Sequence, residues 1–303
     1  MTNEQTFEDY LKNQDFSKIT VRGYLFDITH FSEWFLKTNG EKMTPAQITP
    51  IDIKTYRQFL LVEERYKANT INRRLAAIST YIKWARSTGQ IFSDPSENIK
   101  GVSKVKESPK WMNKNEQYAL QRAIEKDLQI SKLRFPKRWI ARRRDASLVI
   151  FLLNTGLRLT ELIAMRMDDL QLSERKGSVL VQNGKGGKQR NIPLNAEARK
   201  ALQDWLAVRP KTKSPYVWTA IETNATGLSG RAIQRIMKRY SEEAGIDEIT
   251  PHICRHTFAK NLINQGVGLE KIAMLLGHSS LNTTRLYITP DEHDLESAVG
   301  KLE

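Results

Sequence analysis

The chain has 303 residues, an apolar share of 40% and a mean hydropathy of −0.51, which predict a folded protein of two domains of ordinary size or one large domain. No apolar run approaches the ~20 residues of a membrane-spanning helix, and the polar, acidic start MTNEQTFEDYLKNQ resembles neither a signal nor a transit peptide. The single cysteine, Cys254, excludes an internal disulfide and a cysteine metal cluster, so we expect a cytoplasmic protein.

The formal net charge of +14 favours a polyanionic partner such as nucleic acid, with surface charge for solubility as the alternative explanation. The excess is uneven along the chain. Residues 1–97 hold 13 Lys and Arg against 12 Asp and Glu, residues 98–150 hold 14 against 5, and residues 151–303 hold 21 against 17. A concentrated basic segment is what a strap along DNA requires.

The first third of the chain, residues 1–97, is predicted to be a small helical domain. One helix covers VRGYLFDITHFSEWFLK, and a second begins at Thr49-Pro50 with a capping threonine and a proline in the first turn. A third, from Asn69 to Arg86, has apolar residues at three- and four-residue steps. We expect its outward side chains to enter the major groove of DNA, a solvated polar face being the alternative. These side chains are Thr70, Arg73, Arg74 and Lys83.

A polar, lysine-rich segment without hydrophobic periodicity, residues 98–112, is predicted to be an extended basic linker after Asp94-Pro95-Ser96. A second basic tract, KLRFPKRWIARRR, follows it. We expect cations of both stretches to neutralise DNA backbone phosphates. The candidates are Lys104, Lys106, Lys110, Arg142, Arg143 and Arg144.

The remainder, residues 113–303, is predicted to be a second, mostly helical domain with a small antiparallel sheet. Residues 178–182 (SVLVQ) and 189–194 (QRNIPL) are rich in strand-forming residues and flank the glycine-rich turn NGKGGK. The fold class is therefore mainly α.

The segment TPHICRHTFAKNLINQG predicts a helix that begins with Thr250 as its cap and Pro251 in its first turn. His252 then lies in the first turn, and Arg255 lies three residues later on the same face. Free N–H groups and the positive end of the helix dipole favour anions there, so this is a candidate phosphate site. The alternative is a solvated pair, because H-x-x-R is common by chance.

Four further positions are candidates only in combination. His278 in LLGHS follows a predicted helix end, and Tyr287 lies nine residues further, where a core tyrosine is the alternative. Arg158 in TGLR precedes a helix, within pairing distance of Glu161. Lys185 lies in the hairpin turn, where lysine is ordinary.

Taken together, the order TGLR, GKG in a hairpin, HxxRH, LGHS and a tyrosine nine residues after that histidine resembles the tyrosine recombinase (phage integrase) family. The resemblance covers about residues 113–290 and is closest to compact Xer-type or transposon-borne recombinases. More weakly, the first domain resembles the family's four-helix SAM-like core-binding domain. One departure is Cys254, where the family more often has leucine, and a small buried cysteine should be tolerated there.

The resemblance implies how the scissile phosphate is held. Arg158 and Arg255 would grip its oxygens, because a guanidinium matches phosphate geometry. His252 would hydrogen-bond the phosphate or accept the tyrosine proton, and His278 would add a further hydrogen bond. Glu161 would orient Arg158 or His252.

Tyr287 is implied as the nucleophile and Lys185 as the acid that protonates the leaving 5′ hydroxyl. A phenol with a pKa of about 10 is a weak nucleophile until cations favour its ionised form. The product would be a 3′-phosphotyrosyl bond that a second strand's hydroxyl attacks, so neither metal, cofactor nor ATP is expected.

The expected partner is double-stranded DNA with specific recombination sites, bound by a homotetramer or by a heterotetramer with a related recombinase. The tail 291–303 would dock on a neighbouring protomer, as in the family. Integration, excision and resolution all remain open. Two other functions do as well: DNA relaxation like that of a type IB topoisomerase, and DNA binding without catalysis.

Overall fold

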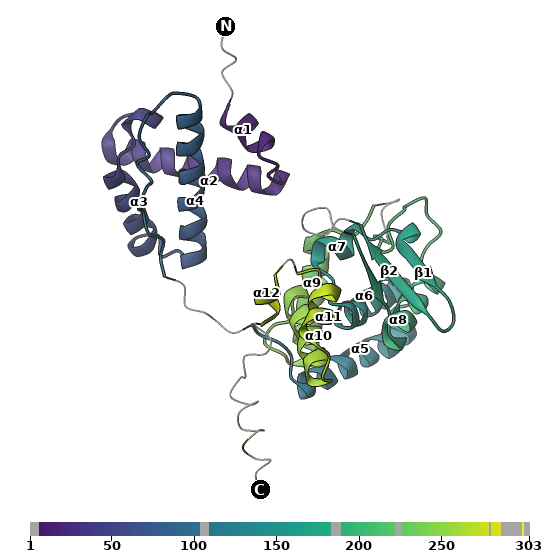
Figure 1. The fold of residues 1–303 in the computed structure, drawn as a ribbon. Coiled ribbons are helices and arrows are strands. Elements are labelled where there is room, and N and C mark those ends of the chain that lie inside the picture. Colours follow the sequence, from purple (N-terminus) through teal and green to yellow (C-terminus); the bar gives the residue numbers. More distant parts are fainter. Residues whose placement is uncertain are drawn as a thin grey trace. The chain divides into compact units, whose positions relative to one another are not determined.

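The computed structural model describes residues 6–103, 109–182, 189–221, 226–278, 280–285 and 299. The chain forms two compact units, Met1–Lys106 and Glu107–Glu303 (Figure 1). Their division falls inside the segment 98–112 that the sequence predicts to be a linker. Among the described residues, no helix has both the length and the apolar character needed to cross a membrane.

The first unit consists of helices whose starts are encoded locally. The hydroxyls of Thr6, Ser17 and Thr49 each accept a hydrogen bond from the backbone N–H three residues ahead, which satisfies a donor that the helix leaves free. The elements are α1 (Phe7–Asn13), α2 (Lys18–Asn39), the 3₁₀ turn η1 (Pro45–Gln47), α3 (Pro50–Val62) and α4 (Ala68–Ser87).

An aromatic cluster forms the core of this unit. The ring centroid of Tyr56 lies 4.8 Å from that of Phe31 and 5.1 Å from that of Trp34, so α2 and α3 are joined by ring contacts. From α4, Ile71 and Ile78 are fully buried against the same cluster. The apolar side chains that give α4 its predicted helical periodicity therefore face this core.

Gly101 and Val102, near the start of the predicted linker, pack on the first unit rather than forming a free linker. Asn72 accepts from the Val102 N–H at 2.7 Å and donates to the Val102 carbonyl at 2.9 Å. A Cβ on Gly101 would lie 2.6 Å from the Asn72 Oδ1, so glycine is needed for this approach. On the second unit, the Met112 N–H donates to the Thr257 hydroxyl at 2.9 Å. Both ends of the predicted linker are thus docked.

In the second unit, helices surround α6, which packs against α5, α8 and α10. The second half of α6 is buried, Leu148 and Phe151 among its residues, because neighbouring helices cover it there. The helical elements are α5 (Lys114–Arg134), α6 (Pro136–Thr155), α7 (Leu159–Ala164), η2 (Met167–Asp169), α8 (Ala196–Val208), α9 (Gly230–Ala244), α10 (Pro251–Asn264), α11 (Leu269–Leu276) and α12 (Leu281–Arg285).

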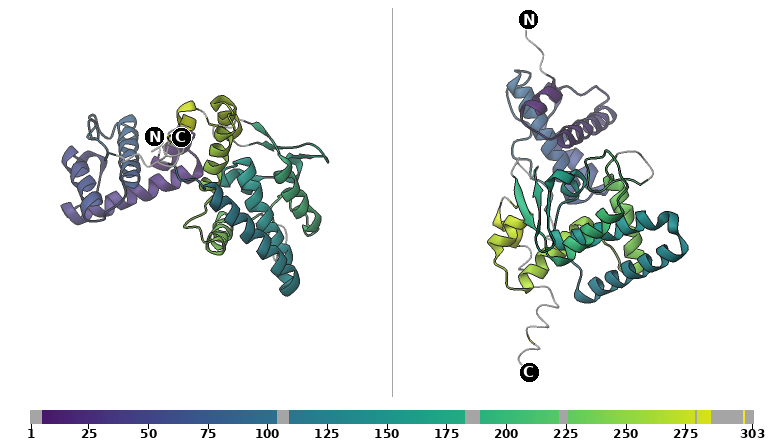
Figure 2. Two further views of the ribbon diagram at one scale, coloured as in Figure 1. Left: turned by 90° about the horizontal axis from the view of Figure 1, so that it is seen from below. Right: turned by 90° about the vertical axis from the view of Figure 1, so that its right-hand side faces the viewer.

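A three-stranded antiparallel sheet lies at one side of these helices (Figure 2). Its order is β1 (Leu170–Leu172), β2 (Gly177–Val181) and β3 (Arg190–Pro193). The pairing of Val181 with Arg190 brackets the predicted hairpin turn, and β1 is a strand that the sequence did not predict. The predicted fold class, mainly helical with a small antiparallel sheet, is confirmed.

Candidate active site

The predicted start of α10 is confirmed in detail. The Thr250 hydroxyl accepts the Ile253 N–H at 3.1 Å, and Pro251 occupies the first turn, where no N–H is needed. His252 follows as an exposed residue. Arg255 lies almost one turn further and is only 4% exposed. The helix therefore presents its histidine outward and holds its arginine inside.

The end of α11 gathers three arginines from distant parts of the sequence. Successive carbonyls of the chain, those of residues 275, 276 and 277, accept from Arg190 Nε at 2.9 Å, Arg255 Nη2 at 2.6 Å and Arg158 Nη2 at 2.9 Å. The last carbonyls of a helix lack partners within the helix and carry the negative end of its dipole, so cations are favoured there. Helix α11 lies beside α10 and α12 (Figure 1). The three arginines make its end a cationic centre.

Glu161 lies between two of these arginines. Its carboxylate accepts from the backbone and the Nη1 of Arg158, both at 2.8 Å, and from both terminal nitrogens of Arg190. Burial alone would raise the pKa of Glu161, but the hydrogen bonds from Arg190 and Arg158 outweigh it and lower this pKa to about 2. Glu161 therefore remains a carboxylate at neutral pH.

His278 is the first residue beyond the glycine that ends α11. Gly277 has a φ of 65°, a conformation that glycine adopts without strain, and it turns the chain at that point. The His278 Nδ1 lies 2.8 Å from the Thr284 hydroxyl oxygen of α12. Burial, followed by the charges of Arg255 and Arg158, lowers the pKa of His278 to about 4, so this imidazole is neutral at pH 7.

A second imidazole, which the sequence prediction left out, belongs to the same cluster. His256 lies on α10 one turn after His252, with ring centroids 6.5 Å apart. Burial, followed by the charges of His252 and Arg255, lowers its pKa to about 4. The i, i+4 spacing from His252 is a signal that could have identified it.

Comparison with known proteins gives the family. The phage integrase family profile matches residues 114–293, and the phage integrase N-terminal SAM-like domain profile matches residues 5–89. The chain belongs to the phage integrase family. Its Arg, His and Glu cluster lies within the larger match.

Similar proteins span nearly the whole of this integrase-family chain. The tyrosine recombinase XerC of Thermodesulfovibrio yellowstonii is 30% identical over 303 residues, covering 96% of this chain and 94% of the relative. The tyrosine recombinase XerA of Pyrococcus furiosus is 30% identical over 298 residues, covering 98% and 92%. These matches agree with the resemblance that the motifs predict.

Solved structures share the fold at lower identity. XerH recombinase in a post-cleavage complex with palindromic difH substrate has a TM-score of 0.74 at 22% identity, covering 93% of this chain and 79% of that one. A λ integrase dimer bound to a COC′ core site has a TM-score of 0.70 at 17% identity, covering 93% and 92%.

The structure of the integrase-family chain brings together Arg158, Arg255, His278 and Glu161 of the predicted site, with His252 on the helix that carries Arg255. The two remaining predictions, Lys185 and Tyr287, lie outside the described residues. Their roles therefore remain predictions.

The predicted outward direction of Arg74 on α4 is wrong. Arg74 is 4% exposed, and its Nη1 donates to the Tyr56 hydroxyl at 3.2 Å while its Nε lies 3.8 Å from the carboxylate of Asp27. The side chain thus neutralises a buried carboxylate of α2 instead of pointing outward. Arg73 also pairs with Asp27, but 45% of its side chain is exposed.

The other candidates differ in accessibility. Lys83 and Lys110 are exposed, and Thr70 is half-buried. Lys104 and Lys106 lie outside the described residues.

Arg144, which the sequence predicts as a phosphate ligand, is also turned inward. It is 9% exposed, and its guanidinium donates to the Asp145 carboxylate at 2.7 Å and to the Thr219 carbonyl at 2.9 Å. A buried cation with these partners holds α6 to the segment after α8. A phosphate would have to displace both contacts.

Its neighbours are likewise paired within the unit. Arg142 lies 3.4 Å from Asp127 and 3.7 Å from Glu243, and Arg143 lies 3.2 Å from Asp204. Their side chains are 24% and 26% exposed. Carboxylates of α5, α8 and α9 therefore offset part of the basic run of α6. Because both side chains are partly exposed, their contact with DNA phosphates stays a prediction.

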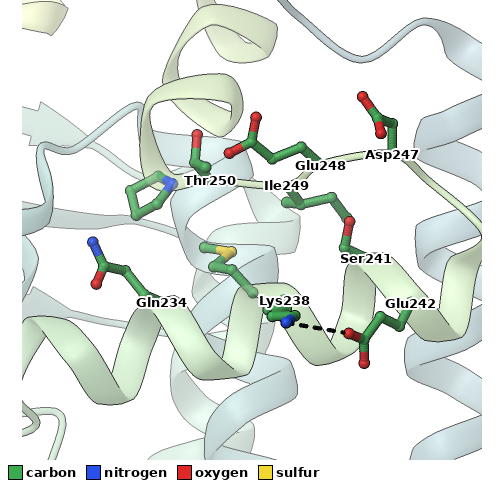
Figure 3. A pocket seen from close by; sticks show the side chains of 10 residues that line it. Gln234, Lys238, Ser241, Glu242, Asp247, Glu248, Ile249 and Thr250 are labelled. Carbon is green, nitrogen blue, oxygen red and sulfur yellow. Dashed lines mark ion pairs between the residues drawn. The ribbon is translucent and has the colours of Figure 1, made fainter. Parts of the chain in front are cut away.

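A surface pocket between α9 and the segment that leads into α10 has a volume of about 430 Å³ (Figure 3). Lys238 pairs there with Glu242 at 3.8 Å, and Asp247 and Glu248 add two more carboxylates. This excess of negative charge disfavours a phosphate. The arginine cluster at the end of α11 is the better candidate for DNA.

Proposed function

We propose that this protein is a site-specific DNA recombinase that cleaves and rejoins strands through a 3′-phosphotyrosyl intermediate on Tyr287. The observation that carries the proposal is the convergence of Arg158, Arg255 and His278 at the end of α11. Family membership and the recombinase relatives support it.

The proposed cleavage requires stabilised negative charge. The Tyr287 oxygen attacks phosphorus as the bond to the 5′ oxygen breaks, and charge grows on the nonbridging oxygens. Preorganised guanidinium groups at Arg158 and Arg255 stabilise that charge. His252 accepts the phenol proton and Lys185 supplies one to the leaving oxygen, so protons balance. The new bond keeps the energy of the phosphodiester, which a 5′ hydroxyl of the partner strand then uses.

A neutral His278 fits the role of hydrogen-bond donor to the phosphate. When its Nδ1 accepts from the Thr284 hydroxyl, the ring carries its proton on Nε2. Burying the neutral ring in this half-buried position costs less free energy than burying an imidazolium would. The arginines supply positive charge, and His278 supplies a hydrogen bond that orients the phosphate.

DNA contacts outside the active site are proposed at polar residues that are accessible or lie outside the described part of the chain. They neutralise backbone phosphates or enter the major groove beside α4. These residues are Thr70, Arg73, Lys83, Lys104, Lys106, Lys110, Arg142 and Arg143.

A nicked DNA substrate that traps the covalent complex tests the chemistry. The wild-type protein is expected to give a protein–DNA band in a denaturing gel, and Tyr287→Phe is expected to give none. Tyr118→Phe, which removes the hydroxyl of a tyrosine that is 57% exposed on α5, is the matched control and should behave like wild type. A covalent band from Tyr287→Phe, or none from a wild-type protein that binds the DNA, would contradict the proposal.

Strand exchange then separates the proposed recombinase from a DNA-relaxing enzyme. Two sites on differently labelled duplexes should give recombinant products, whereas a topoisomerase of the same chemistry would only relax supercoils. Products of relaxation without exchange would decide against recombination.

The proposed working assembly is a tetramer on paired sites, of this chain alone or with a related recombinase, in the cytoplasm. The tail 291–303, of which the structure describes only residue 299, is proposed to join neighbouring protomers. Its deletion should weaken cooperative assembly on paired sites and spare binding to a single site. Unchanged cooperativity would count against this role.

A further inference from the structure

Arg190 opens β3 and uses all three of its guanidinium nitrogens within the candidate active site. Its Nη1 and Nη2 donate to the two oxygens of Glu161 at 2.9 and 2.8 Å, and its Nε donates to the Leu275 carbonyl at 2.9 Å. Its side chain is only 12% exposed. One residue of the sheet therefore connects the start of α7 with the end of α11.

The charge balance around Glu161 depends on this residue. Arg158 and Glu161 alone would form a neutral pair, and the carboxylate would compete with DNA for the Arg158 guanidinium. With Arg190 added, the three side chains carry a net charge of +1. The carboxylate is then shared between two cations, so Arg158 retains attraction for a phosphate.

The fit of Arg190 against Gly277 gives a second, independent reason. A Cβ at Gly277 would lie 2.8 Å from the Arg190 Nη1 and 2.9 Å from its Cζ, closer than real Cβ contacts. The guanidinium therefore packs directly on the backbone that precedes His278. Because three hydrogen bonds hold it in place, Arg190 limits where the end of α11 lies.

We propose that Arg190 is a positioning residue, which keeps Arg158 and the His278-bearing end of α11 in the arrangement that binds the scissile phosphate. This inference rests on the proposed function. Arg190 itself does not touch the reacting atoms. It acts through Glu161 and through the Leu275 carbonyl.

Two other roles make different predictions. Arg190 could serve only the stability of the sheet, in which case its loss lowers the melting temperature without a specific effect on cleavage. It could instead place the Lys185 hairpin, in which case its loss impairs protonation of the leaving oxygen. A substrate with sulfur at the bridging 5′ position separates placement of the Lys185 hairpin from positioning of the phosphate site. A thiol, with a pKa of about 8.5, leaves without an acid, so only a defect in Lys185 placement is rescued.

The experiment measures single-turnover formation of the covalent complex on nicked DNA with 5′ oxygen or 5′ sulfur at the cleaved bond. For Arg190→Met we expect a loss in rate on the order of 10²-fold on both substrates, with DNA affinity changed much less. Lys185→Ala should be impaired on oxygen and largely restored on sulfur. Arg190→Lys keeps the charge but not the fork of donors, so it should fall between Arg190→Met and wild type.

Arg209→Met is the matched structural control. Arg209 also donates to backbone carbonyls, those of Ser214 and Tyr216, but its partners lie in the segment that follows α8. We expect it to lower the melting temperature with a nearly unchanged cleavage rate. If Arg190→Met does not fold, the ratio of oxygen to sulfur rates in Arg190→Lys makes the same decision.

The outcomes are distinct. A wild-type rate for folded Arg190→Met, or recovery of that variant on the sulfur substrate, would overturn the positioning role. Failure of the wild-type protein to form any covalent complex would instead overturn the proposed function. The expected result is an equal loss of cleavage rate in Arg190→Met on the two substrates, with a nearly unchanged cleavage rate in Arg209→Met.

Discussion

Arg190 and Glu161 form a two-bonded ion pair, Nη1 to Oε1 at 2.9 Å and Nη2 to Oε2 at 2.8 Å, between β3 and α7. The Glu161 side chain is 4% exposed and also accepts from the Arg158 side chain. Unlike an exposed ion pair, such a buried carboxylate is costly to leave without its partners. The pair therefore links the stability of the second unit to the geometry of its phosphate site.

Glu161→Gln should destabilise the protein at neutral pH, by about 3 kcal/mol, because two arginines lose the charge that compensates them. Since the folded pKa of about 2 lies below the ordinary 4.5, the carboxylate stabilises the fold above pH 4.5, and this contribution is lost as pH falls toward 2. Urea unfolding at pH 7 and pH 3 should thus show a smaller difference between variant and wild type at the lower pH.

Glu174→Gln is the control for that comparison, because Glu174 is an exposed residue of the turn between β1 and β2. It should change the free energy of unfolding little at either pH. A loss in Glu161→Gln that is the same at pH 7 and pH 3 would exclude ionisation of Glu161 as the cause.

His256 and His278 predict a second loss of stability as pH falls, which comes from buried bases and lies at higher pH than that of Glu161. Both have a folded pKa of about 4 against an ordinary 6.5, so the unfolded chain takes up their protons first as pH falls. Their contribution to stability is present above pH 6.5 and disappears between pH 6.5 and 4. Each should contribute about 1 kcal/mol after allowance for solvent screening.

Urea unfolding of His256→Gln between pH 7.5 and 4 checks this expectation. The variant should lose stability less steeply than wild type over that interval, because a glutamine takes up no proton. His252→Gln removes one of the charges that lower the pKa of His256, so it should reduce the slope by a smaller amount. Identical slopes for His256→Gln and wild type would refute the assignment.

Local signals explain which parts of the fold and site were predictable. Thr250 and Pro251 define the start of α10 within a few residues of sequence, and the glycine-rich turn defines the β2–β3 hairpin in the same way. Arg158, Arg255 and His278 lie beside such helix ends. Their motifs could therefore be recognised without knowledge of the tertiary structure.

Charges paired across the fold were not predictable from one segment. Arg190 contacts residues 29 and 85 positions away in the sequence, and nothing near it indicates those partners. Arg74 shows a different error, since it lies three residues after Ile71 and four before Ile78, on the apolar face of α4. That spacing indicates burial, and only the buried carboxylate of Asp27 makes a cation acceptable there.

The buried thiol of Cys254 gives a prediction about reactivity. Burial raises the pKa of Cys254 to about 12, and the residue is 0% exposed, so the reactive thiolate is absent from the folded protein. A thiol reagent should modify the chain only in denaturant. Cys254→Leu should fold and cleave DNA, whereas Cys254→Ser should lose about 1–3 kcal/mol because it buries a hydroxyl. Rapid labelling of the native protein would contradict this account.

Arg74 and Lys83 lie on one helix and should separate DNA binding from folding. Lys83→Ala removes an exposed cation of α4, so the slope of log affinity against log salt should fall by about 0.9 if it neutralises one phosphate. Arg74→Met should leave that slope unchanged. It should instead lower the free energy of unfolding by about 3 kcal/mol, because Asp27 stays buried with one partner fewer.

Filter binding at several salt concentrations, with a melting curve for each variant, distinguishes the two residues. Because α4 carries both side chains, a general disturbance of the helix would alter both quantities in both variants. Because Arg74 is buried, we instead expect only Lys83→Ala to change the salt slope and only Arg74→Met to lower the free energy of unfolding. A reduced salt slope in a folded Arg74→Met variant would mean that this guanidinium reaches DNA. A wild-type slope in Lys83→Ala would mean that Lys83 of α4 does not contact a DNA phosphate.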